Sequence, residues 1–192
     1  MKMTIKPILF NTEMVRAILD GRKSCTRRIV KHDVGAILNS PYHKEHPEVA
    51  DKQIISKLCI PPYQPGDILY VRETWKKAPN GYYYEDWQRN DIADVTKWKP
   101  SIHMPKEAAR IWLKITDVRV ERLQEITIDG IRSEGLSSMA VHVGDMEIAV
   151  KEWELLWNST IKKSDLDRYG WAADPWVWVI EFVQCEKPKE EN

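Results

Sequence analysis

The segment DPWVWVIEF, residues 174–182, most constrains what this chain can fold into. A half-buried strand alternates apolar and polar side chains, whereas this segment carries apolar side chains at successive positions. Such a run is typical of a strand that is buried on both faces. The sequence therefore predicts a sheet in which this last strand is covered on both sides.

Further local patterns predict the other elements. Helices are expected at 11–20, 127–134 and 150–157, strands at 24–30, 68–75, 108–118 and 117–123, and a hairpin turn at 80–81. Residues 32–62 show no sustained period and are interpreted as an irregular insertion. Helices are too few for alternating β-α-β units, which favours the α+β class. We expect a small, mostly antiparallel β-barrel with flanking helices and loop insertions.

Composition bounds the domain organisation and the class of partner. The chain has 192 residues and 43% hydrophobic residues, which favours one enlarged domain over 1–185 followed by a flexible tail at 186–192. Twenty-nine basic residues balance 29 acidic ones, so a non-specific DNA coat protein is disfavoured. Nothing resembles a targeting or membrane-spanning segment, so we expect a cytoplasmic protein. Three scattered cysteines fit a reducing compartment and suggest no zinc site.

The block GRKSCTRR, residues 21–28, concentrates side chains that can carry chemistry. It follows the first predicted helix and enters a strand whose alternation places Thr26 and Arg28 on one face. Lys23 can act as a base only when neutral, and the neighbouring arginines lower the pKa of its amine, as partial burial would. A neutral Lys23 could activate the Thr26 hydroxyl for hydrolysis.

The same block allows a second interpretation from the residues alone. Its cationic side chains would form a solvated or phosphate-contacting patch, and Thr26 would be an ordinary strand residue. The known phosphate-loop, dinucleotide, nucleophile-elbow and zinc-protease motifs do not occur in the sequence. His43 and His46 lie in a proline-flanked segment and are not expected to bind a metal ion.

Four blocks occur in the order found in one known family. Residues 21–28 resemble the G-[RK]-K-T-x-T-x-R signature that opens ASCH domains, which are small PUA-like β-barrels. Residues 65–69 resemble the family's G-D-x-L turn and strand, residues 126–135 its L-T-x-x-x-A-x-x-E-G helix, and residues 178–182 its closing strand. The resemblance implies a PUA-like barrel with a site at the basic block.

The resemblance also implies an activity. The best-defined one in this family belongs to small bacterial amidohydrolases that remove the acetyl group from N4-acetylcytidine. By position, Lys23 would activate Thr26, Thr26 would attack the acetyl carbonyl, and Glu134 would relay a proton to the departing amine. Neither a metal ion nor another cofactor is expected.

Five residues are expected to bind the substrate, namely Arg22, Ser24, Arg28, Trp75 and Trp171. Arg28 shares the face of Thr26 and would bind an oxyanion or a phosphate. Ser24 replaces the family's usual threonine and keeps its hydroxyl. Trp75 and Trp171 lie beside turns, where an aromatic ring can stack on a base. The expected partner is a modified nucleoside or single-stranded RNA.

The chain is longer than the minimal amidohydrolases of the family. The resemblance therefore implies that residues 32–62, 75–104 and 137–172 are insertions around the barrel mouth. This longer arrangement resembles the ASCH-type proteins carried by bacteriophages and prophages. Two other functions remain open, namely a non-catalytic RNA-binding module and a metal-independent ribonuclease that uses lysine, arginine and glutamate.

Overall fold

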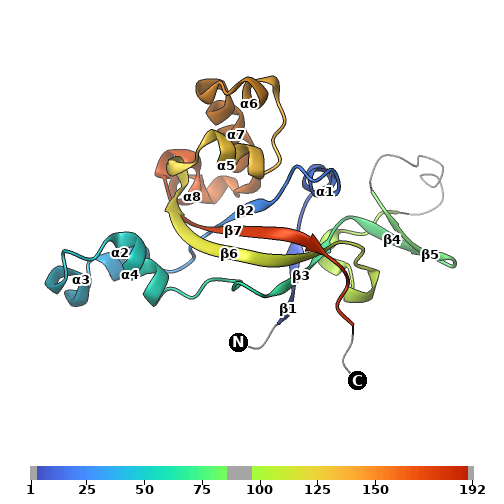
Figure 1. Ribbon diagram of the computed structural model, residues 1–192, viewed down its shortest axis with the longest axis horizontal. Helices are drawn as coiled ribbons and strands as arrows, with labels where there is room; N and C mark the ends of the chain where they lie inside the picture. Colours follow the sequence, from blue (N-terminus) through green and yellow to red (C-terminus); the bar gives the residue numbers. More distant parts are fainter. Residues whose placement is uncertain (1–3, 86–96, 190–192) are drawn as a thin grey trace.

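A five-stranded sheet forms the main layer of the protein (Figure 1). The computed structural model describes residues 4–85 and 97–189. The main sheet has the order β1-β3-β6-β7-β2, and β4 and β5 form a separate hairpin. The strands are β1 (Ile5–Leu9), β2 (Cys25–Ile29), β3 (Ile68–Arg72), β4 (Trp75–Ala78), β5 (Gly81–Tyr84), β6 (Trp112–Arg122) and β7 (Trp176–Cys185). Strand β1 runs parallel to β3, and the other paired strands are antiparallel.

The helices lie in groups around this sheet. They are α1 (Thr12–Leu19), α2 (Val34–Leu38), α3 (Pro41–Glu45), α4 (Asp51–Leu58), α5 (Ile128–Ser133), α6 (Met139–Val143), α7 (Met146–Thr160) and α8 (Leu166–Tyr169). Figure 1 shows α5 to α8 gathered beside β2 and one end of β6 and β7, with α2 to α4 on one side and the β4-β5 hairpin on the opposite side. Every helix within residues 4–85 and 97–189 is too short or too polar to form a transmembrane span.

Strand β7 is covered on both faces, which confirms the prediction from its sequence. Val177 and Val179 pack in a cluster with residues of α5, α6 and α7. Trp178, Ile180 and Phe182 belong to a second cluster, which includes residues of β1, α1, β3 and β6. Full burial of each large apolar side chain contributes about 1.5–3 kcal/mol, so both faces of this strand contribute to the stability of the fold.

The sheet does not close into a barrel. Strand β1 pairs with β3 and strand β2 with β7, and no ladder joins β1 to β2 in the described residues. Closure requires a continuous ring of inter-strand hydrogen bonds. The amide just before β2, on Ser24, instead donates to the carbonyl of Ser133 in α5 (2.9 Å). The α+β class with mostly antiparallel strands is confirmed, and the closed barrel is corrected to an open sheet.

Residues 32–62 contain helices α2, α3 and α4, so their interpretation as an irregular segment is wrong. The side chains of Asp33 and Ser40 cap α2 and α3, and α4 buries Ile54 and Ile55. These helices have only five to eight residues, too few for a 3.6-residue period to emerge from the sequence.

The other local predictions are largely confirmed. The hairpin turn lies at 79–80, since Ala78 pairs with Gly81. The strand patterns at 108–118 and 117–123 become one long strand, β6, whose register with β7 shifts between Ile115 and Asp117. Of the expected insertion at 75–104 and tail at 186–192, residues 86–96 and 190–192 lie outside the described residues.

Gly135 brings helix α5 close to the turn that follows α1. Its φ of +98° lies in the left-handed region, where glycine is favoured. A β-carbon there would lie 2.8 Å from Cβ of Ala17 and 3.1 Å from Cβ of Lys23. The end of α5 therefore packs directly against the backbone that presents Lys23.

We expect Gly135→Ala to lower the free energy of unfolding by about 2–5 kcal/mol, since backbone strain adds about 1–2 and overpacking about 1–3. Urea denaturation measures the change. Gly144→Ala is the matched control, because its φ is +79° but no atom lies within 4 Å of the new β-carbon. This control should show the strain contribution alone, and equal losses in the two variants would contradict the close packing.

Candidate active site

A small chamber of about 100 Å³ lies where α1, β2, α5 and α7 meet. Lys23, Thr26 and Glu134 line it, and each is no more than 4% exposed. Phe10, Asn11 and Met14 and the α7 residues Trp153, Leu156, Trp157 and Thr160 complete much of the wall. Buried polar side chains cost stability unless they are paired, so their convergence on a cavity marks a candidate site.

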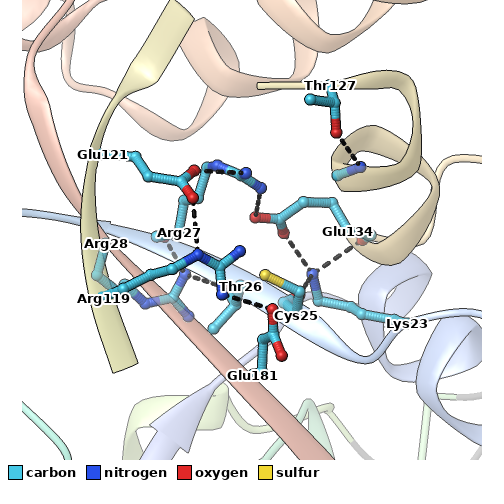
Figure 2. A network of polar contacts seen from close by, with 11 residues as sticks. Lys23, Cys25, Thr26, Arg27, Arg28, Arg119, Glu121, Thr127, Glu134 and Glu181 are labelled. Atoms are coloured by element: carbon cyan, nitrogen blue, oxygen red, sulfur yellow. Dashed lines mark hydrogen bonds and ion pairs between the residues drawn. The ribbon is translucent and has the colours of Figure 1, made fainter. Parts of the chain in front are cut away.

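The ammonium group of Lys23 has three acceptors. Its Nζ donates to the carbonyl of Cys25 (2.7 Å), the carbonyl of Glu134 (2.8 Å) and Oε2 of Glu134 (2.7 Å), as Figure 2 shows. Three donors with three acceptors is the geometry of a protonated amine. Burial lowers the pKa of Lys23, and the Glu134 carboxylate opposes that shift.

Glu134 is shared by two cations. Its Oε1 accepts from Nη1 of Arg27 (3.2 Å), while its Oε2 accepts from Lys23. Arg27 is 4% exposed and also reaches Glu121 (3.4 Å), which in turn pairs with Arg119 (2.7 Å; Figure 2). The Glu134 carboxylate thus fixes the position of Lys23, which lies in the turn, and of Arg27, which lies in strand β2.

Thr26 and Arg28 point to the same side, as the alternation predicts. Nη1 of Arg28 donates to Oγ1 of Thr26 (2.8 Å; Figure 2). The hydroxyl oxygen therefore acts as an acceptor here, and its own hydrogen stays available to a base. A cation that donates to this oxygen also favours the ionised form of the hydroxyl.

A larger groove of about 630 Å³ adjoins the chamber. The two cavities share the lining residues Phe10, Asn11, Met14, Arg27, Arg28, Trp157 and Thr160. The groove is further lined by the rings of Tyr63 and Trp178 and by the exposed side chains of Lys31 and His32. A flat ligand can therefore rest among aromatic rings while its reacting group reaches the chamber.

Two of the predicted binding residues lie outside both cavities. Arg22 is exposed and donates to the carbonyl of Gly135 (2.6 Å) and to Asp20 (3.0 Å), so it holds the turn in place. Ser24 is exposed as well, and neither residue lines the chamber or the groove.

The two predicted aromatic binding residues also lie elsewhere. Trp75 is buried in a third cluster with Tyr70 and Trp112. Trp171 packs against the α5 to α7 cluster, and its amide donates to Oδ1 of Asn158 (2.8 Å). The tryptophans that line the two cavities are Trp153, Trp157 and Trp178, none of which the sequence singled out as a binding residue.

Sequence reasoning missed the central position of Arg27. Strand alternation placed this residue on the face opposite Thr26, away from the expected site. One feature of the sequence could have indicated that a side chain packs against helix α5. Gly130 lowers the stability of this short helix by about 1 kcal/mol relative to alanine, so its presence requires a reason. A β-carbon at Gly130 would lie 3.1 Å from Nη2 of Arg27, so this glycine leaves room for the guanidinium group.

Cys25 is a packing residue of the cluster that includes Val177 and Val179. It is 3% exposed, and burial raises the pKa of its thiol to about 12, which disfavours the nucleophilic thiolate. Among the residues that the structure describes, no three His, Cys, Asp or Glu side chains are grouped so that they could hold a metal ion.

Comparisons with known proteins add little to this geometry. No family model matches the chain, and no curated protein matches it. An ASCH domain structure from Lactobacillus crispatus is similar with 12% identity and a TM-score of 0.41, covering 94% of this chain and 79% of that one. The hypothetical protein PH0355 is similar with 13% identity and a TM-score of 0.42, covering 95% and 100%. Similarity this weak carries no argument, and ASCH membership stays a prediction from the sequence blocks.

The shared carboxylate predicts an order of stabilities. Glu134→Gln leaves two buried cations without their carboxylate and should lower the free energy of unfolding by about 3–5 kcal/mol. Lys23→Met leaves Glu134 paired with Arg27, so we expect a loss of about 1–3 kcal/mol from the unmet carbonyl groups. Urea denaturation of both variants tests this order, and a larger loss for Lys23→Met would refute it.

Lys151→Met is the matched control for this comparison, because Lys151 pairs with Glu147 on the exposed face of α7. Its removal should leave the free energy of unfolding nearly unchanged.

Proposed function

We propose that the chamber and groove bind a modified nucleoside and that Lys23, Thr26 and Glu134 hydrolyse an amide on its base. The substrate would be of the N4-acetylcytidine type. One observation carries this proposal: three buried polar side chains from separate elements converge on a small cavity that adjoins an aromatic groove. Such a site suits a planar base whose exocyclic amide enters the chamber.

The Lys23-Glu134 pair would supply the proton transfers. When substrate displaces water, the proton of the Lys23 ammonium passes to the Glu134 carboxylate, 2.7 Å away. Neutral Lys23 then accepts the Thr26 proton as Thr26 Oγ1 bonds to the acetyl carbon. Glu134 gives its proton to the departing base amine as the C–N bond breaks, which restores the ion pair.

A second cycle would release the acetyl group. The proton again passes from Lys23 to Glu134, and Lys23 accepts a proton from the attacking water. Glu134 protonates Thr26 Oγ1 as the ester bond breaks, which leaves the free hydroxyl and acetic acid, and the acid loses its proton to solvent as acetate departs. Arg27 and Arg28 line the same chamber and would stabilise the negative charge that develops on the acyl oxygen.

The test measures the release of cytidine from N4-acetylcytidine, with chromatography as the method of detection. Lys23→Ala, Thr26→Ala and Glu134→Gln should each lower kcat/KM by about 10²–10⁴-fold, whereas Thr26→Ser should retain part of the activity. The Lys23→Ala/Thr26→Ala double variant should be no slower than the slower single variant, because the two residues act as a unit.

Ser137→Ala is the control, because this exposed residue lies in the loop between α5 and α6. Acid quenching of the wild-type reaction should also yield a peptide acetylated at Thr26, detected by mass spectrometry. No release of cytidine by the wild type, or full activity in Thr26→Ala, would exclude this reaction.

The pH dependence follows from the shared proton. The reaction requires one proton on the Lys23-Glu134 pair, and burial lowers the pKa of Lys23 below its ordinary value of 10.5. Above that lowered pKa the pair holds no proton for the departing amine, so kcat/KM should fall as pH rises, with a midpoint below 10.5. The residual activity of Lys23→Ala should lack this decline, and a wild-type rate that rises through this range would contradict the scheme.

A non-catalytic RNA-binding module is the second candidate. The exposed Lys31 beside Arg28 in the groove favours it. Under this alternative the affinity for a single-stranded RNA would fall steeply with salt and survive Lys23→Ala with a modest loss. A gel of the same labelled RNA would also reveal cleavage, which would point to the ribonuclease.

A further inference from the structure

The groove carries a charge that the chain as a whole does not. Its described lining contains Arg27, Arg28, Lys31 and His32 and no Asp or Glu, although the chain has 29 residues of each sign. Low-dielectric walls with charge of one sign concentrate the field within a cleft. The groove therefore attracts an anion locally, without any long-range attraction from the whole protein.

Arg28 is a cation of this groove without a direct carboxylate partner among the described residues, although the charge of Glu134 opposes the lowering of its pKa by burial. Its guanidinium group donates to Oγ1 of Thr26 (2.8 Å) and to the carbonyls of Arg27 (3.0 Å) and Leu9 (3.2 Å). All three acceptors are neutral, and no carboxylate pairs with Arg28 within 4–85 and 97–189. Arg27, by contrast, contacts two carboxylates.

Lys31 lies two residues past β2 and adds to the lining of the groove a second cation without a carboxylate partner among the described residues. It is exposed, lines the groove, and has no ion pair in the part of the chain that the structure describes. His32 next to it accepts from the amide of Ile60 through Nε2 (3.3 Å). That contact leaves Nδ1 as the protonated nitrogen, a further donor beside Lys31.

Arg28 lines both cavities, so it marks the boundary between the chamber and the groove. A base whose exocyclic group reaches Thr26 would extend its sugar towards the groove, and Arg28 is one of the residues that line both spaces. The next substituent along a nucleotide is a phosphate, and guanidinium and ammonium groups are its usual ligands.

We propose that the ligand is a nucleotide whose phosphate binds Arg28 and Lys31. The identity of the base rests on the proposed function, whereas the phosphate subsite rests on the groove itself. The same chemistry suits the monoester of a mononucleotide and the diester of an RNA strand. Under either source, the phosphate is a determinant of affinity and a free nucleoside is the weaker ligand.

Calorimetric titration tests the subsite without any turnover. Cytidine and its 5′- and 3′-monophosphates are titrated into the wild-type protein, and we expect one monophosphate to bind about tenfold more tightly than cytidine. Lys31→Glu should abolish this preference. Lys187→Glu makes the same change in net charge at an exposed residue that does not line the groove, and it should retain the preference.

Equal affinities of the wild type for cytidine and both monophosphates would overturn the proposal, as would a preference that survives Lys31→Glu.

A tri-cytidine RNA that binds more tightly than the better monophosphate identifies a strand as the source of the phosphate, and equal affinity identifies a mononucleotide. A phosphate preference without cytidine release from N4-acetylcytidine would exclude the proposed reaction and leave the subsite standing. Cytidine release without a phosphate preference would support the proposed reaction and exclude the phosphate subsite.

Discussion

The shared carboxylate of Glu134 is the interaction on which the rest of the site depends. It joins Lys23, from the turn after α1, to Arg27, from edge strand β2, and it comes itself from the end of α5. Removing charges from water costs several kcal/mol per ion, which only good pairing geometry offsets. The three elements must therefore meet in one arrangement, and the cavity between them is fixed by that requirement.

The apolar clusters around the sheet supply the stability that such a network needs. The chamber lies between them, with Phe10 of one cluster and Trp153 and Trp157 of the other in its wall. These side chains exclude water and lower the local dielectric constant, so the ion pairs and hydrogen bonds inside are stronger than at the surface. Burial also lowers the pKa of Lys23, which lowers the cost of moving its proton to an acceptor.

The two adjoining cavities divide recognition from chemistry. In the chamber, one carboxylate compensates two cations, and the hydroxyl of Thr26 faces Arg28. In the groove, the described lining holds cations and aromatic rings without a carboxylate. A planar ligand with a negative group at one end matches this division, since rings favour stacking and uncompensated cations favour anions.

Local physics made much of this fold predictable from the sequence. Asn11 and Thr127 cap α1 and α5 at the start of two helices that the sequence predicted, because a cap depends on residues only three positions away. The apolar run in β7 likewise predicted a strand that is buried on both faces, as the two clusters show. The four sequence blocks also singled out Lys23, Thr26 and Glu134, which the structure brings to one chamber.

Only the tertiary structure decided what surrounds those three residues. Lys23 and Glu134 are 111 positions apart, and no local pattern records which side chains lie between them. Arg27 contacts Glu134 although strand alternation places it on the face opposite Thr26. Trp75 and Trp171 pack in apolar clusters outside the two cavities. The sequence by itself determined caps, turns and buried faces, since these depend on short-range hydrogen bonds and periodicity. The open sheet and the lining of the cavities were decided by packing between distant elements, which no short segment encodes.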